Sequence, residues 1–149
     1  MFYGARCCKA VLDNDTMNYI MFGKGTKPLV ILPGLGDGLS PDNGQLQAVI
    51  FAINYKKFAE QFKVYIFSRK NSLKENYSTR DMAEDQAEVM KTLGISKAYV
   101  MGVSQGGMIA QYLAVDHPEL VEKLVLAVTL PGPNETMQKT VNGWKKMAE

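Results

Sequence analysis

The sequence contains a single histidine, His117, and only two cysteines, the neighbours Cys7 and Cys8. Adjacent residues on an extended chain point to opposite faces, which disfavours an ordinary disulfide between the two cysteines. These three residues also cannot supply the four ligands of a tetrahedral zinc site at normal spacing. We therefore expect reduced thiols, as in the cytoplasm, and a protein without a metal or another cofactor.

Long apolar runs and an excess of charge of one sign are missing as well. No stretch approaches about 18 apolar residues, and residues 1–15 lack the apolar core of a secretory signal. Seventeen Lys and Arg residues against fifteen Asp and Glu residues leave a net charge of +2, without a basic stripe interleaved with aromatic residues. These absences predict a soluble cytoplasmic protein with no membrane segment and no nucleic-acid partner.

What the chain does contain is an alternation of strand-like and helix-like segments, in a length of 149 residues that suits one domain. Short apolar runs bounded by turn residues indicate strands, and apolar residues at helical spacing indicate helices. Strands are expected at about residues 8–13, 17–25, 28–33, 62–69, 97–103 and 121–130. Helices are expected at about residues 44–61, 78–94, 105–117 and 134–149. This alternation predicts an α/β fold with a largely parallel sheet.

Two of these helices carry further expectations. The helix at residues 44–61 can be interrupted at Asn54 and Tyr55, and Ser40-Pro41 before it are candidates for its cap and first turn. The helix at residues 105–117 is apolar almost all round, which predicts burial against the sheet rather than a place on the surface.

The most specific motif is Gly-Val-Ser-Gln-Gly at residues 102–106, a G-x-S-x-G pattern between a predicted strand and a predicted helix. Such a sharp turn strains Ser104 and brings backbone close to the positions on either side. Glycine at 102 and 106 removes the clash, and Gly107 permits close packing of the next helical turn. Ser104 would then stand at a helix N-terminus, whose N–H groups favour the negative charge of an acyl-transfer intermediate.

A second glycine-rich stretch, Pro-Gly-Leu-Gly-Asp-Gly at residues 33–38, follows the third predicted strand. Gly34 and Gly36 would let the backbone come close to a reacting group. The backbone N–H groups of Leu35 and Gln105 can then form an oxyanion hole. Removing one such donor typically costs about 2.7–4 kcal/mol of transition-state stabilisation, so the loop would matter to the chemistry.

Dinucleotide binding is an alternative interpretation of the same loop. The third glycine of the dinucleotide pattern would fall on Leu39, however, and the next strand ends in Ser68-Arg69 rather than in an acid for the ribose. Both departures weaken this interpretation.

Together these segments resemble the α/β-hydrolase superfamily, and the likeness covers nearly the whole chain. The matching stretches are residues 29–38, 62–69, 78–95 and 100–129. The resemblance implies a three-layer, mostly parallel sheet with about six of the family's eight strands. By the same resemblance, residues 1–133 form the N-terminal part of the core and residues 134–149 an amphipathic helix at the start of the lid or cap region.

The resemblance also assigns roles. Ser104 is implied to be the nucleophile, the backbones of Leu35 and Gln105 the oxyanion hole, and a small acyl compound the substrate. Family members carry the acid after strand seven, or less often six, and the histidine after strand eight. The acid and base are therefore expected beyond residue 149, and the chain is expected to be an N-terminal fragment that is inactive alone.

No residue of the chain is an obvious base for Ser104. A base must lie within about 2.6–3.2 Å, whereas His117 follows thirteen residues later along one predicted helix, about 20 Å away. His117 is expected instead at the helix C-terminus, near its negative dipole end. Glu135 follows the sixth strand and is a candidate acid, but a glutamate in a first helical turn is more often a capping choice.

Two apolar surfaces would stay uncovered in such a chain. Residues 121–130 would form an exposed edge strand, and helical spacing gathers Met137, Val141, Trp144 and Met147 on one face without a partner. Leaving four large side chains in water forgoes up to about 6–12 kcal/mol. We therefore expect self-association or a complementing C-terminal segment. The alternative to an enzyme is a non-catalytic, hydrolase-like scaffold that binds a partner chain through these surfaces.

Overall fold

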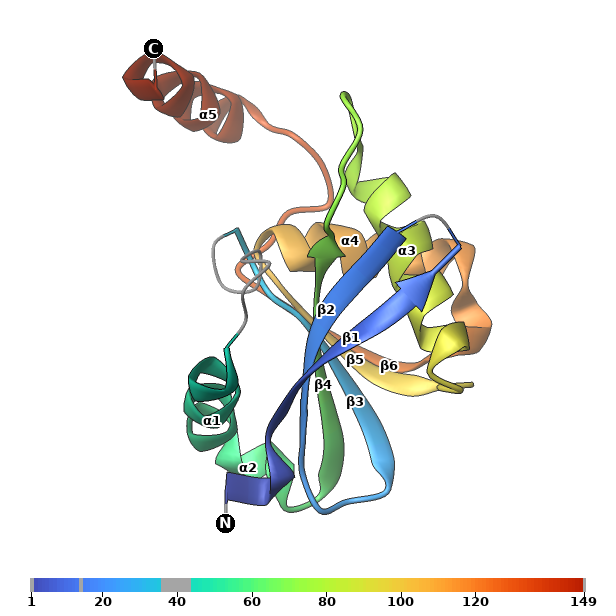
Figure 1. Ribbon diagram of the computed structural model, residues 1–149. Coiled ribbons are helices and arrows are strands. Elements are labelled where there is room, and N and C mark those ends of the chain that lie inside the picture. The colour runs from blue at the N-terminus through green and yellow to red at the C-terminus, as the bar shows by residue number, and fades with distance from the viewer. Residues whose placement is uncertain (1, 14, 36–43, 149) are drawn as a thin grey trace.

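The computed structural model describes residues 2–13, 15–35 and 44–148, and its centre is a six-stranded sheet in the order β1-β2-β4-β3-β5-β6 (Figure 1). The strands are β1 (Arg6–Leu12), β2 (Asp15–Phe22), β3 (Lys27–Leu32), β4 (Phe62–Lys70), β5 (Ala98–Val103) and β6 (Val121–Ala127). The helices are α1 (Gln45–Asn54), α2 (Lys56–Ala59), α3 (Thr79–Thr92), α4 (Gln105–Asp116) and α5 (Glu135–Ala148), with 3-10 turns at Phe2–Gly4 and Pro118–Leu120.

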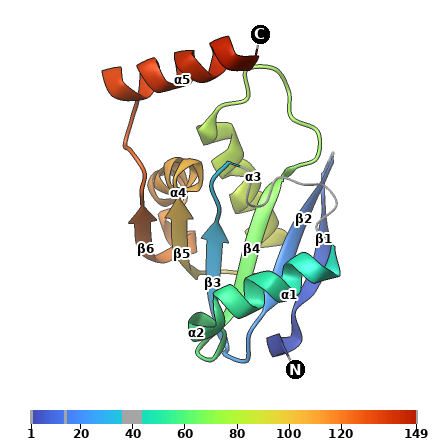
Figure 2. The ribbon, with the colours of Figure 1, turned by 90° about the vertical axis from the view of Figure 1, so that its left-hand side faces the viewer.

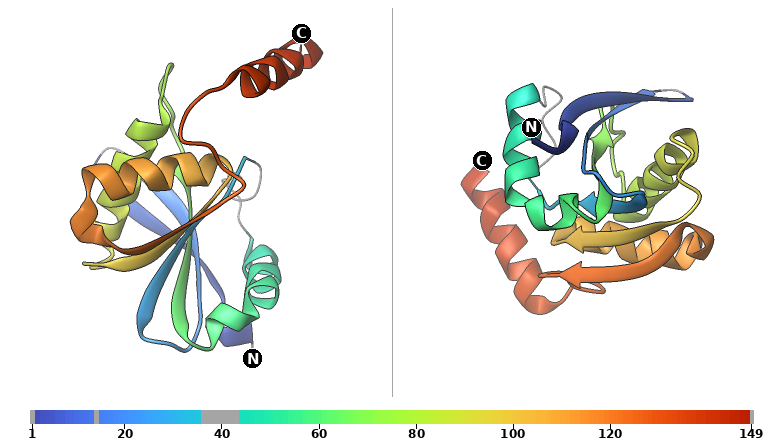
Figure 3. Two further views of the ribbon diagram at one scale, coloured as in Figure 1. Left: turned by 180° about the vertical axis from the view of Figure 1, so that it is seen from behind. Right: turned by 90° about the horizontal axis from the view of Figure 1, so that it is seen from below.

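The sheet is mostly parallel, as the alternation of elements predicts. β3, β4, β5 and β6 pair in parallel, and the hairpin of β1 and β2 joins β4 as an antiparallel extension. Helices α1 and α2 cover one face of the sheet (Figure 2), and α3 and α4 cover the other (Figure 3). The three-layer α/β architecture expected from the sequence is therefore confirmed.

Strand β3 shows how the two faces are filled. Successive side chains of a strand point to opposite faces, so its apolar run divides between two cores. Leu29 and Ile31 join the core beneath α1 and α2, whereas Val30 and Leu32 join the core beneath α3 and α4. A continuous apolar strand is thus what a sheet covered on both faces requires.

Element boundaries follow the sequence closely, with one shift and one break. The second strand begins at Asp15 rather than Met17, because the Asp15 carboxylate accepts hydrogen bonds from the N–H groups of Thr16 and Ser72. The first long helix is interrupted at Tyr55, as expected. The proposed cap at Ser40-Pro41 lies outside the described residues.

The prediction that α4 is buried all round is wrong for one face. Ile109, Ala110 and Leu113 are buried, but Tyr112 is exposed and Val115 is 74% exposed. Helix α4 packs between the sheet and α3, and these two contacts leave its third side open.

The last strand, β6, forms the expected apolar edge. It pairs with β5, and among the described residues no further strand continues the sheet beyond it. Leu124, Val125 and Leu126 are all exposed. A separate feature of the described residues is that no helix is long and apolar enough to span a membrane.

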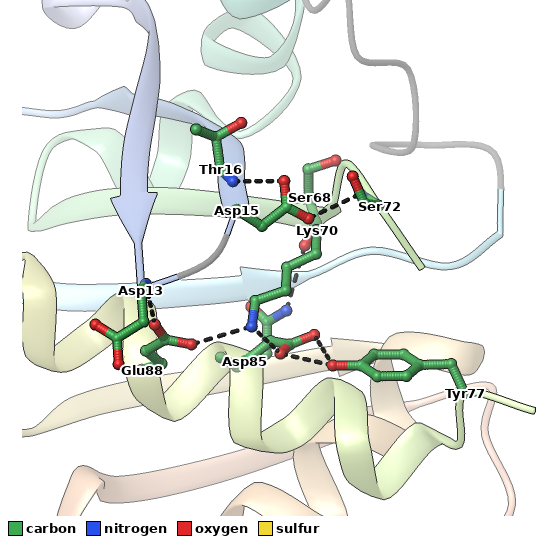
Figure 4. Close-up of polar contacts among 10 residues, drawn as sticks. Asp13, Asp15, Thr16, Ser68, Lys70, Ser72, Tyr77, Asp85 and Glu88 are labelled. Atoms are coloured by element: carbon green, nitrogen blue, oxygen red, sulfur yellow. Dashed lines mark hydrogen bonds and ion pairs between the residues drawn. The ribbon is translucent and has the colours of Figure 1, made fainter. Parts of the chain in front are cut away.

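Helix α3 is held to the sheet by a buried ion pair. The Asp85 carboxylate lies 2.8 Å from Lys70 Nζ at the end of β4 and accepts a hydrogen bond from the Tyr77 hydroxyl (Figure 4). Glu88, one turn further along, also accepts a hydrogen bond from Lys70 Nζ, at 3.1 Å. Burial alone would lower the pKa of Lys70, but its bonds to both carboxylates outweigh burial and raise the pKa. Lys70 is therefore charged at neutral pH.

We predict that Asp85→Asn destabilises the fold by about 2–3 kcal/mol. Breaking a fully buried pair typically costs about 3–5 kcal/mol, and the loss is smaller here because Lys70 keeps its contact with Glu88. Urea unfolding should show a lower midpoint with an unchanged slope.

Arg80→Met is the matched control for this variant, because it removes an ion pair with Asp116 in which the arginine is largely exposed. Its unfolding midpoint should stay close to that of the wild type. Equal midpoints for the wild type and Asp85→Asn would show that the buried pair does not hold α3 in place.

Candidate functional site

Ser104 occupies a sharp turn between β5 and α4. Its backbone has φ 52° and ψ −120°, a conformation that side-chain-bearing residues rarely adopt. The Ser104 N–H donates a 2.9 Å hydrogen bond to the Ala127 carbonyl at the end of β6. The Ser104 carbonyl accepts from the Gly107 N–H and from the Thr129 hydroxyl. The turn is thus held from both the strand and the helix, while the residue itself stays exposed.

The glycines around Ser104 have steric reasons in the structure. A Cβ at position 102 would lie 2.6 Å from the Gly106 carbonyl oxygen, and one at position 106 would overlap the Leu32 carbonyl. At position 107 a Cβ would lie 2.5 Å from the Thr129 side chain. The space at 107 is therefore taken by the segment after β6 rather than by the next turn of α4.

The glycine-rich loop after β3 passes directly beside Ser104. A Cβ at Gly34 would lie 3.2 Å from the Ser104 Cβ, and Leu35 lines the same cavity as Ser104 and Gln105. The structure therefore brings together the residues that the sequence assigns to an oxyanion hole. Gly36 lies outside the described residues.

A cavity of about 550 Å³ opens in front of Ser104. It lies between the carboxyl ends of the parallel strands and α5, which crosses above them (Figure 2). Carboxyl strand ends are where open α/β sheets bind ligands. Its apolar walls are formed by Leu35, Met108, Val128, Leu130, Met137, Val141 and Trp144. No charged side chain of the described residues lines it.

This cavity corrects the expectation that the apolar stripe of α5 has no partner. Met137, Val141 and Trp144 face the same space as Ser104. Met137 and Val141 are half-buried, whereas Trp144 is 55% and Met147 78% exposed. Sequence spacing identified the stripe but could not show that half of it turns toward the serine.

Sequence reasoning missed Arg69, a buried charge beside the site. Its Nη2 donates a hydrogen bond of 2.9 Å to the Pro33 carbonyl and one of 3.2 Å to Gln105 Oε1. The residue is only 4% exposed. Burial lowers the pKa of Arg69 to about 10, so the guanidinium remains charged at neutral pH. The available signal was an arginine placed directly at the end of an apolar strand.

His117 stands at the opposite end of α4 from Ser104, as expected. Its N–H bonds to the Leu113 carbonyl at the helix C-terminus, and its Nε2 lies 3.0 Å from both carboxylate oxygens of Glu84 on α3. The contact with Glu84 was not foreseen. At 1.5 Å per residue, the twelve residues of α4 separate His117 from Ser104 by about 18 Å.

Glu135, the candidate acid, lies in the first turn of α5 and is not among the residues that line the Ser104 cavity. The helix is capped by its neighbour Asn134, whose Oδ1 accepts a hydrogen bond from the Met137 N–H. Among the described residues no three His, Cys, Asp or Glu side chains are grouped to hold a metal ion.

We predict that Gly106→Ala destabilises the protein by at least about 3 kcal/mol, because the new methyl group meets backbone that cannot move aside. Gly143→Ala is the matched control. A Cβ there has nothing within 4 Å, and alanine favours helix α5 by up to about 1 kcal/mol. Thermal unfolding of both variants measures the difference, and equal stability would contradict the close approach at Leu32.

Comparison with known proteins places this geometry in a family. The chain is 32% identical over 137 residues to a protein of Serratia proteamaculans named "Putative carbamate hydrolase RutD", covering 86% of this chain and 43% of that protein. It is 28% identical over 136 residues to epoxide hydrolase 1 of Caenorhabditis elegans, covering 91% and 33%. The chain thus spans less than half the length of these relatives.

Solved structures agree. The epoxide hydrolase CorEH superposes with a TM-score of 0.76 at 24% identity, over 93% of this chain and 50% of that one, which shows a shared fold. An alpha/beta hydrolase from Nostoc superposes with a TM-score of 0.75 at 25% identity, over 100% of this chain and 53% of that one. Residues 27–149 also match the family described as the alpha/beta hydrolase fold, and the chain therefore belongs to that family.

Proposed function

We propose that the protein is a serine hydrolase of the esterase type, with Ser104 as its nucleophile. The observation that carries this proposal is the placement of Ser104: an exposed, strained serine at the N-terminus of α4, facing a cavity of about 550 Å³. A fold accepts backbone strain of this kind chiefly where function requires it. The hydrolase names of the relatives support the general reaction class.

In the proposed reaction, the Ser104 hydroxyl oxygen forms a bond to the acyl carbon, and a base takes its proton. The carbonyl electron pair moves onto the oxygen, where the N–H groups of Leu35 and Gln105 stabilise the negative charge. Collapse of this intermediate breaks the bond to the alcohol or amine, which leaves with a proton. Water then releases the acid from the serine.

The proposed base comes from outside these 149 residues. His117 is bound to Glu84 at the far end of α4, and Glu135 does not line the cavity. The chain also spans less than half of its relatives, which leaves room for an acid and a histidine in a complete protein. We therefore propose that the chain is inactive without that further sequence.

The cavity supports a substrate with an uncharged, apolar acyl group. Its walls are apolar side chains and neutral polar groups such as Thr129, Thr140 and Asn134. A charged acyl group would lose its hydration there without gaining an opposite charge. Cys7 and Cys8 are free thiols, which supports a cytoplasmic location for this reaction.

A non-catalytic scaffold is the second candidate. The exposed apolar edge of β6, together with Trp144 and Met147, favours a surface that another chain covers. The partner in this case would be a second copy or a complementing C-terminal segment.

A fluorophosphonate probe tests the enzyme proposal directly. In the complete protein that contains this chain, the probe should label Ser104, and Ser104→Ala should abolish labelling. Ser96→Ala, which changes an exposed serine in the turn before β5, is the control and should leave labelling unchanged. A folded complete protein that the probe does not label would argue against the enzyme and for the scaffold.

The acyl preference gives an independent prediction. The complete protein should hydrolyse p-nitrophenyl butyrate with a kcat/KM at least about tenfold above that for the mono-p-nitrophenyl ester of succinic acid, whose carboxylate must enter the apolar cavity. Val141→Asp should lower kcat/KM for the butyrate ester by about tenfold or more. Asn142→Asp places the same charge one residue further on, outside the cavity lining, and should have little effect. Equal rates for both esters would show that the cavity does not select the substrate.

A further inference from the structure

Arg69 connects the two parts of the chain that carry the oxyanion donors. It leaves the carboxyl end of β4, whereas Gln105 follows β5, and β3 lies between these strands in the sheet. The Arg69 side chain therefore reaches across the end of β3. A single nitrogen, Nη2, donates both to the Pro33 carbonyl in the glycine-rich loop and to the Gln105 side chain.

These two contacts adjoin the donors. Pro33 lies two residues before Leu35, and Gln105 bears its donor on its own backbone. The loop is otherwise rich in small residues, which give it little side-chain packing of its own. A hydrogen bond from a charged, buried group is short of competing water and is stronger than a neutral one. Arg69 thus fixes the loop to the start of α4.

The arrangement is costly for the fold. The Nε and Nη1 groups of Arg69 are buried and have no hydrogen-bond partner among the described residues. A buried donor left unpaired typically costs about 1–3 kcal/mol. A long apolar side chain at this position would avoid that cost. Stability alone therefore does not account for an arginine, whereas a function for its charge and its two bonds does.

We propose that Arg69 is a positioning residue for the oxyanion hole, which holds the glycine-rich loop and Gln105 at a fixed separation. This inference rests on the proposed function. As the acyl oxygen gains negative charge, the N–H groups of Leu35 and Gln105 must already be in place, because movement at that moment would cost part of the stabilisation. The positive charge of Arg69 behind them adds a favourable potential in a site with little water.

This role differs from a purely structural one in its kinetic signature. A residue that only supports the fold would change the amount of active protein, and both kcat and KM would be unaffected in the fraction that stays folded. A residue that positions the oxyanion donors acts on the transition state, so kcat should fall while KM for an uncharged ester stays within about twofold.

The test compares variants of the complete protein with p-nitrophenyl butyrate and with the fluorophosphonate probe. Arg69→Met should lower kcat, and the rate of Ser104 labelling, by about 10- to 100-fold, somewhat less than the loss of a direct donor. Arg69→Lys keeps the charge but not the planar fork, and should fall between Arg69→Met and the wild type. Arg6→Met removes an exposed arginine from β1, at the far edge of the sheet, and should match the wild type.

Gln105→Met provides a second route if Arg69→Met does not fold. It cuts the same link from the other side while keeping the backbone donor, and should lower kcat by about tenfold with KM unchanged. A folded Arg69→Met or Gln105→Met protein with kcat within twofold of the wild type would overturn the proposal.

Failure of the positioning role can be told apart from failure of the enzyme proposal. If the probe labels wild type and Arg69→Met equally fast, only the positioning role fails. If the probe does not label the wild type at all, the enzyme proposal fails, and the amide NMR signals of Leu35 and Gln105 still test the link. Both signals should shift in Arg69→Met but not in Arg6→Met, and unchanged signals would overturn the link itself.

Discussion

The contact on which the site depends is the close approach of the first turn of α4 to the ends of β3 and β5. Backbone meets backbone there, because the positions of Gly102 and Gly106 leave no space for a Cβ beside Leu32. Only with the helix this near can the chain turn within one residue, so that Ser104 takes its strained backbone and stands clear of the sheet. The same closeness brings the loop after β3 beside the serine and Gln105 within reach of Arg69.

Much of this architecture could be predicted from the sequence, because the signals are local. Apolar runs of strand length, helical spacing, and the Ser78–Asp81 capping box mark where the elements begin and end. The glycines at 102 and 106 mark the turn because no other residue fits a backbone contact. The break at Tyr55 was visible for the same reason: the helical pattern changes there within a few residues.

The contacts that the sequence did not reveal join segments far apart in the chain. Arg69 reads as an ordinary polar residue at the end of a strand, and its burial depends on α4 lying over it. The bond between His117 and Glu84 and the pair of Lys70 with Asp85 both span two elements. The open face of α4, which contains Tyr112, reflects what does not pack against it, and periodicity within one helix cannot reveal that.

The hydrogen bond from the Ser104 N–H to the Ala127 carbonyl makes the outermost strand part of the nucleophile's support. β6 is also the strand with the most exposed edge among those described. Local opening begins at such edges, and it frees the groups that the edge holds. Each time the end of β6 frays, the turn at Ser104 loses one of its anchors. A chain or segment that pairs with β6 would therefore tighten the serine at a distance, without touching the cavity.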